Sequence, residues 1–279
     1  MRRAYVGLVF VFVACFGSRS ILTPAQNAIV NVEQESLRQE NSTEAVRWLV
    51  EEGEALLESF PLEREVFVFL LRHQATAGYA RLDTSPVDTF ARGKETARAC
   101  LRLNGAWEVM ERLDGGRITI PALRRLEVVD LPCVRQLLFH WLYWVVEQGP
   151  AGLVDLRVIE SLTDRVFELS QGDETWVEHW ALGMIAGLSR QDAETIPKMT
   201  LHFGRAQALA EGLSIPTIDH MALLIRHSHA PSRVARELST WSEKPFQVHD
   251  AAQWSLENRA SLKRAIDLLG GLRGELPED

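Results

Sequence analysis

Signatures of catalysis and cofactor binding are missing from this 279-residue sequence. It has no G-x-S-x-G elbow, no glycine-rich phosphate loop, no H-E-x-x-H and no C-x-x-C motif. The closest pair among its eight histidines, His227 and His229, would point to different faces of a helix, as would the adjacent Glu178 and His179. We therefore predict a protein that is not an enzyme and that binds no metal ion or other cofactor.

Positive charge is also scarce. The formal net charge is −8, and removal of Arg2 and Arg3 with a signal peptide would bring it to −10. A nucleic-acid-binding protein needs basic patches that displace counterions from phosphates. The acidic residues are scattered along the chain, so we attribute them to solubility and expect no nucleic-acid partner.

The apolar run at the N-terminus, Ala4 to Ala14, is too short to cross a bilayer as a helix, which takes about 20 residues. It follows Arg2 and Arg3 and gives way to small polar residues, which is the pattern of a secretory signal peptide. The alternative is a buried strand or the start of a buried helix. We predict a signal peptide over residues 1–14.

Cysteine is rare, with three in the chain, and the first of them ends the apolar run. Val13-Ala14-Cys15 resembles the end of a bacterial lipobox, whose cysteine is lipidated and becomes the mature N-terminus. We predict lipidated Cys15 and a linker over residues 15–41, which tether the folded part to a membrane on the periplasmic side. By resemblance to lipoprotein sorting rules, Phe16 after the cysteine favours the outer membrane.

The other two cysteines are Cys100 and Cys133. An oxidising compartment permits a disulfide between them, but the sequence does not establish that their backbones come close enough. Both lie in apolar helical contexts, which favours two separate buried thiols.

Helical periodicity dominates the rest of the chain. Beyond residue 42, apolar residues recur three and four apart, and no segment alternates as a strand would. The turn at Leu113 to Arg117 and Pro121 interrupt the pattern. The predicted helices cover residues 42–60, 62–81, 86–103, 131–148, 153–170, 174–188, 193–212, 217–229, 232–242 and 251–272. We predict an all-α domain over residues 42–276, with antiparallel neighbours because the loops are short.

Four helix ends resemble the end of a tetratricopeptide pair. Their apolar landmarks are Leu57, Cys100, Phe167 and Leu209, which lie 43, 67 and 42 residues apart. A standard tetratricopeptide period is about 34 residues, so the repeats would be long and degenerate. We predict tetratricopeptide-like helical pairs that form an α-solenoid with a C-terminal packing helix. The alternative is an ordinary helical bundle.

Aromatic residues gather in two helical segments, "LLFHWLYWVV" at 137–146 and "TWVEHWALGMIAG" at 175–187. A helix that is apolar on every side must be surrounded, so these rings either fill a solid core or line an internal apolar cavity. The small residues Gly183, Ala186 and Gly187 either let another helix come close or leave space beside the indoles. For the cavity hypothesis, the predicted pore residues are Trp180, Trp144, Trp141, Tyr143, Trp176 and His140.

Several motifs occur in an order that resembles the TatT family, the tetratricopeptide-like lipoproteins of tripartite ATP-independent periplasmic (TRAP) transporters. They are the lipobox ending at Cys15 and the segments "LLESFP", "ATAGYA", "LLFHWLYWVV", "VIESLTDRVFEL", "WVEHWALGMIAG" and "LENRASLKRAIDLL".

The resemblance implies an all-helical, non-enzymatic periplasmic lipoprotein that can assemble as a homotrimer. It also implies a hydrophobic pore through each subunit and a partner, the transporter's periplasmic solute-binding protein, to which a ligand would be handed. The alternative is a tetratricopeptide-type scaffold lipoprotein for cell-envelope assembly, which would have a solid core and no small-molecule ligand.

Overall fold

The computed structural model describes residues 22–36, 39, 42–82, 85–105, 107, 119–189, 192–227, 229, 231–243 and 255–275. The predicted signal peptide, Cys15 and the turn at Leu113 to Arg117 lie outside these residues. Over the ranges just given, the regular secondary structure is helical and no strand occurs. The all-α class is therefore confirmed.

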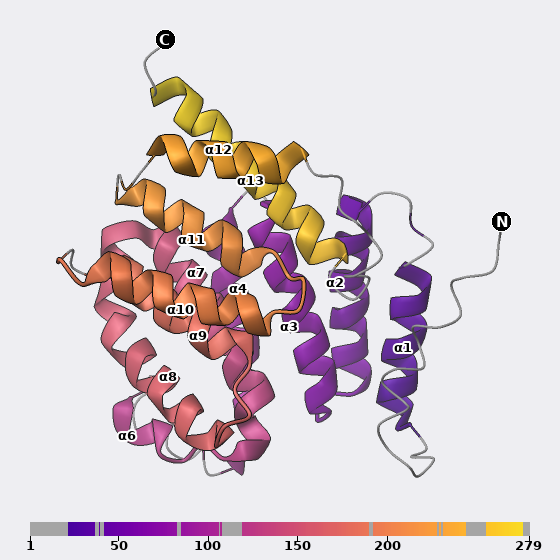
Figure 1. The fold of residues 1–279 in the computed structure, drawn as a ribbon. Helices are drawn as coiled ribbons and strands as arrows, with labels where there is room; N and C mark the ends of the chain where they lie inside the picture. The colour runs from indigo at the N-terminus through magenta and orange to yellow at the C-terminus, as the bar shows by residue number, and fades with distance from the viewer. Residues whose placement is uncertain are drawn as a thin grey trace.

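The α-helices are α1 (Pro24–Ser36), α2 (Ser42–Ser59), α3 (Arg64–Tyr79), α4 (Pro86–Leu101), α6 (Ile120–Leu123), α7 (Leu131–Gln148), α8 (Leu156–Ser170), α9 (Trp176–Leu188), α10 (Thr195–Leu209), α11 (Ile215–Arg226), α12 (Pro231–Glu243) and α13 (Ser255–Glu275) (Figure 1). Two 3₁₀ segments, η1 (Val128–Asp130) and η2 (Gly149–Asp155), flank α7. None of the described helices combines the length and the apolar character that crossing a bilayer would require.

Local signals explain several of these boundaries. The Ser85 side chain caps α4 by accepting a hydrogen bond from the backbone N–H of Asp88. Thr175 and Glu178 form a capping box at the start of α9. Gln171 adopts a left-handed backbone with φ 48° and ends α8. These helix ends are set by their own sequences.

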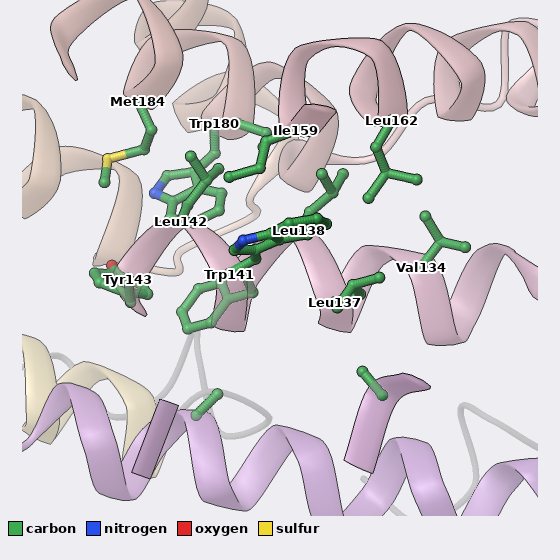
Figure 2. Packing of buried hydrophobic residues seen from close by; sticks show 14 of the residues in the cluster. Val134, Leu137, Leu138, Trp141, Leu142, Tyr143, Ile159, Leu162, Trp180 and Met184 are labelled. Carbon is green, nitrogen blue, oxygen red and sulfur yellow. The ribbon is translucent and has the colours of Figure 1, made fainter. Parts of the chain in front are cut away.

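The main core surrounds α7, which packs against α3, α4, α8 and α9. Figure 2 shows the side chains of α7, among them Leu138, Trp141 and Leu142, facing Ile159 of α8 and Trp180 of α9. The predicted helix at 131–148 is α7 itself, and its apolar surface is covered on several sides, as a helix without a polar face requires.

A second, smaller core lies between α11, α12 and α13. Its fully buried members include Ile218 of α11, Leu238 of α12 and Ala265 of α13. The helix α13 also returns to α2 and α3 (Figure 1, yellow over indigo and purple). There, Arg72 Nε of α3 donates a 2.6 Å hydrogen bond to Glu257 Oε1 of α13. A C-terminal packing helix is therefore present.

The structure does not confirm the predicted repeats, because their four landmarks differ in burial. Of the four landmarks, Cys100 is fully buried, whereas Leu57, Phe167 and Leu209 are half-buried. The return of α13 to α3 also differs from an open array, in which each repeat contacts only its neighbours. The helical-pair solenoid stays a prediction.

The segment assigned to the linker contains a helix. α1 packs on α2 and α3, and its Ala25 is buried. The helical part thus begins before residue 42. Ala25, Ile29 and Val32 recur four and three residues apart and form a short apolar stripe, of which Ala25 is buried and the other two are half-buried.

Cys100 and Cys133 form a disulfide, which corrects the prediction of two separate thiols. Cys100 lies in the last turn of α4 and Cys133 in the first turn of α7, and the packing of these helices brings the two Cα atoms to 6.0 Å. That separation is within the range of disulfides, about 4.4–6.8 Å. Both cysteines are buried as predicted, but they are bonded to each other and are not separate thiols.

Candidate functional site

The aromatic residues predicted to line a pore lie together around α7 and α9. Trp180, Tyr143 and His140 have no exposed surface, and Trp141 is buried. The Trp180 ring stacks on Phe139 at a centroid distance of 4.9 Å and meets the Tyr143 ring at 5.4 Å. A residue on the wall of a water-sized channel would expose surface, so these side chains act here as packing groups.

The small residues of α9 bring helices close to it. A Cβ at Gly183 would lie 2.8 Å from the Phe203 ring of α10, and one at Gly187 would lie 2.5 Å from Leu223 Cδ1 of α11. Of the two interpretations left open by the sequence, close helix packing is therefore the correct one at these glycines. The Phe203 ring occupies the place beside α9 that Gly183 leaves free.

The remaining predicted residues lie at the edge of this cluster. Trp144 is half-buried, and Lys94 Nζ lies 3.7 Å from the centre of its ring. Trp176 is also half-buried and meets the Trp180 ring edge-on at 6.2 Å. The Trp141 indole donates a 2.7 Å hydrogen bond to Asp155 Oδ2. A cation–π contact thus holds the ring of Trp144 in place, and a hydrogen bond holds that of the buried Trp141.

His140 lies between the aromatic cluster and α3. Its Nε2 is 3.0 Å from the carbonyl oxygen of Leu71. Burial disfavours the charged imidazolium and lowers the pKa of His140 to about 4. The imidazole is therefore neutral near pH 7 and belongs to the core.

Behind the aromatic cluster lies a buried carboxylate, Asp219 of α11, which the sequence analysis did not identify. It accepts hydrogen bonds from three side chains: Tyr79 Oη to Oδ1 at 3.3 Å, Trp180 Nε1 to Oδ2 at 2.8 Å, and Tyr143 Oη to Oδ2. Four helices, α3, α7, α9 and α11, therefore meet at this one side chain. Two of its three donors, Tyr143 and Trp180, are predicted site residues.

The electrostatics of this network depend on Arg264 of α13, whose Nε lies 3.8 Å from Asp219 Oδ1. Burial raises the pKa of Asp219, while the arginine acts in the opposite direction. Burial and the nearby carboxylate raise the pKa values of Tyr79 and Tyr143 well above the ordinary value, so both remain hydrogen-bond donors. Burial opposes the charge of Arg264, but the phenols and Asp219 outweigh it and raise its pKa, so the guanidinium stays cationic.

A surface pocket of about 380 Å³ adjoins the network on the side of Arg264. It lies where α13 crosses the ends of α3 and α11. The residues that line it are Tyr79, Arg81, Ile225, Arg264, Asp267, Leu268, Gly271 and Leu272. Its volume is at the lower end of the range for small-molecule sites, about 300–1,000 Å³.

Of the six residues predicted from the sequence, none lines this pocket. Tyr143 and Trp180 donate hydrogen bonds to Asp219, which lies beside the pocket residue Arg264. A sequence signal for Asp219 existed: it lies four residues after Ile215 and four before Leu223, both buried, so it sits on the apolar stripe of its helix. An acid on such a stripe needs buried partners. The sequence does not show which residues these partners are.

Within the described part of the chain, no group of three or more histidine, cysteine, aspartate or glutamate side chains could hold a metal ion. Comparison of the sequence with models of known protein families finds no family that matches, and comparison with curated proteins finds no match either. The family resemblance therefore rests on the sequence motifs alone.

Proposed function

We propose that this chain is a non-enzymatic periplasmic lipoprotein and an accessory component of a TRAP transporter. It would be anchored through Cys15, assemble from tetratricopeptide-like helical pairs and associate as a homotrimer. Its protein partner would be the transporter's periplasmic solute-binding protein. The order of the motifs shared with the TatT family supports this role. The Cys100–Cys133 disulfide is compatible with it, because such bonds persist in oxidising compartments.

The single observation that carries a ligand-handling role is the pocket beside Arg264. It combines a cationic group with the apolar side chains of Ile225, Leu268 and Leu272. The predicted conduit through Trp180 and its neighbours is replaced in this proposal by a site at the protein surface, since those rings pack against one another. A surface site can exchange its ligand with a partner that docks over it.

Membrane anchoring and partner binding test the proposal. The full chain should enter the detergent phase in Triton X-114 partitioning, and Cys15→Ser should remain aqueous or uncleaved. The purified mature domain should bind the solute-binding protein of the TRAP transporter from the same organism in biolayer interferometry. Equal partitioning of wild type and Cys15→Ser, with both cleaved to the same length, would remove the tether, and no association with the solute-binding protein would remove the transporter role.

A scaffold lipoprotein without a ligand is the second candidate. The complete burial of Trp180 and Tyr143 favours it over a conduit through the core, because a scaffold is expected to have a solid aromatic core. Such a core makes Trp180→Ala costly, about 3–5 kcal/mol, for a scaffold and a ligand-binding protein alike. Ligand binding at the pocket therefore separates the two candidates, whereas the stability of tryptophan variants does not.

A further inference from the structure

We propose that the pocket between α3, α11 and α13 binds an amphipathic organic acid whose single carboxylate is held by Arg264. This assignment deepens the ligand-handling role proposed above and rests on it. It names a site outside the predicted pore residues and gives the chemical class of its ligand.

The first argument is that Arg264 has hydrogen-bonding capacity to spare. Its Nε is buried, has no hydrogen-bond partner among the described residues and lies 3.8 Å from Asp219 Oδ1, too far for a hydrogen bond, so the groups left for a ligand are the two terminal NH₂ groups. Asp219 is already satisfied by three other donors. The arginine thus compensates the charge of Asp219 without forming a hydrogen bond to it.

The second argument is that Arg264 is held in position. The centre of its guanidinium lies 5.1 Å from the Tyr79 ring and 5.9 Å from the Tyr143 ring. Its side chain is only 14% exposed, and that exposure opens into the pocket it lines. A guanidinium packed against two rings presents its donors in one direction, which lowers the entropic cost of binding an anion.

The third argument sets the charge of the ligand. The other cation in the lining, Arg81, already donates to both carboxylate oxygens of Glu147, at 3.0 and 3.4 Å. Asp267, the acid in the lining, lies 3.8 Å from Lys263. Arg264 is therefore the one cation of the lining without a hydrogen-bonded acid. Because Arg264 already offsets the charge of Asp219, a monocarboxylate adds one negative charge that the arginine N–H groups can bind, whereas a phosphate dianion would add two beside Asp219 and Asp267.

The fourth argument concerns the rest of the ligand. Ile225, Leu268 and Leu272 give the pocket an apolar wall. A Cβ placed at Gly271 would meet no atom within 4 Å, so the missing side chain at this position leaves room. An acid with a medium-length alkyl chain or an aryl body can place its carboxylate at Arg264 and its apolar part along α13.

Two neighbouring glycines allow a matched test. Gly270 and Gly271 are both exposed on α13, and a Cβ at either position meets no atom within 4 Å, but only Gly271 lines the pocket. Gly271→Phe should fill the pocket, whereas Gly270→Phe adds the same group to the same helix outside it. Neither substitution touches the Asp219 network. This pair keeps the test valid even if Arg264→Met fails to fold.

The experiment is a calorimetric titration of the mature domain with decanoate, decanol and decyl phosphate. Decanoate should bind best, and Arg264→Met and Gly271→Phe should each weaken it by about tenfold or more, as expected for loss of a charged hydrogen bond or of the space for the ligand. Gly270→Phe should leave decanoate binding unchanged. Equal affinity for decanol, tighter binding of decyl phosphate, or an unaffected Gly271→Phe variant would overturn the assignment.

Association with the solute-binding protein is measured on the same variants. If the partner binds while decanoate does not, the ligand assignment fails and the transporter role stands. If decanoate binds with the expected pattern while the partner does not, the pocket assignment stands and the transporter role fails.

Discussion

Replacing His73 of α3 by leucine should make the protein less sensitive to acid. His73 is 5% exposed, and neither of its ring nitrogens has a hydrogen-bond partner among the described residues. Burial, aided by the positive charge of Arg72, lowers its pKa from 6.5 to about 3. The imidazole is therefore neutral in the folded protein at any pH at which the protein would be handled. Leucine preserves an apolar side chain of similar size beside Phe69, whose ring lies 4.6 Å from that of His73.

The magnitude follows from the difference in proton binding. The unfolded chain binds a proton at His73 below about pH 6.5, and the folded chain does so only near pH 3, so stability falls as the pH drops between these values. By about pH 5 the loss is about 2 kcal/mol relative to neutral pH. His140, whose pKa is lowered to about 4, contributes a similar loss over the same interval. Together the two histidines should cost the wild type about 4 kcal/mol.

The measurement is urea unfolding followed by circular dichroism at about pH 7.5 and about pH 5. His73→Leu should lose about 2 kcal/mol less than the wild type between the two conditions. It should be at least as stable as the wild type near neutral pH, because it removes two buried polar atoms without partners. His229→Gln is the control, since this side chain is exposed and outside the core. An equal acid-induced loss in His73→Leu and wild type would refute the argument.

Two further predictions concern packing around the same core. Replacing both Cys100 and Cys133 by serine should cost about 3.7 kcal/mol in the chain-entropy model for a separation of 33 residues, measured by denaturant unfolding, and addition of reductant should destabilise the wild type but not the variant. Gly93→Ala should destabilise by about 1–3 kcal/mol, because its Cβ would lie 2.1 Å from Nδ1 of the buried His140. Gly204→Ala, where a Cβ meets no atom within 4 Å, should instead be neutral or stabilising by about 0.5–1 kcal/mol, and the opposite order of melting temperatures would contradict the packing described.

Much of the fold could be predicted from local patterns. The intensely apolar segment at 131–148 became α7 at the same residues, and Ser42 begins α2. Such helices were found because their apolar spacing and caps lie within a few residues of each other in the sequence. α1 was missed although Ala25, Ile29 and Val32 recur at helical spacing, because the segment as a whole is polar and was assigned to a linker. A stripe of so few apolar residues is weak evidence for a helix when it stands alone.

The site could not be predicted in the same way, because its residues come from helices far apart in the sequence. Asp219 lies 140 residues from Tyr79 and 76 from Tyr143. The sequence analysis placed Tyr143 and Trp180 in one aromatic site, and the structure brings them to one carboxylate. Periodicity shows which face of a helix is buried, but it does not show which buried faces meet.

The disulfide could not be predicted from the sequence for the same reason as the buried carboxylate. Cys100 and Cys133 each showed the apolar surroundings of a core residue, and both are in the core. Their bond depends on the side-by-side packing of α4 and α7. That packing is set by many contacts along both helices.

The return of α13 to the first helices has a consequence for the order in which the chain is made. A ribosome completes α3 long before it reaches α13. The hydrogen bond between Arg72 and Glu257 can therefore form only after another 185 residues have been synthesised. The 2.8 Å hydrogen bond from the backbone N–H of Ser214 to Asn258 likewise forms only after Asn258 has been synthesised. Contacts of such long range slow folding and leave apolar surface open in the nascent chain. A chain cut before α13 would thus lose the Arg72–Glu257 pair, the partner of Ser214 and one side of the second core. Premature termination should therefore disturb the N-terminal helices as well as the C-terminal ones.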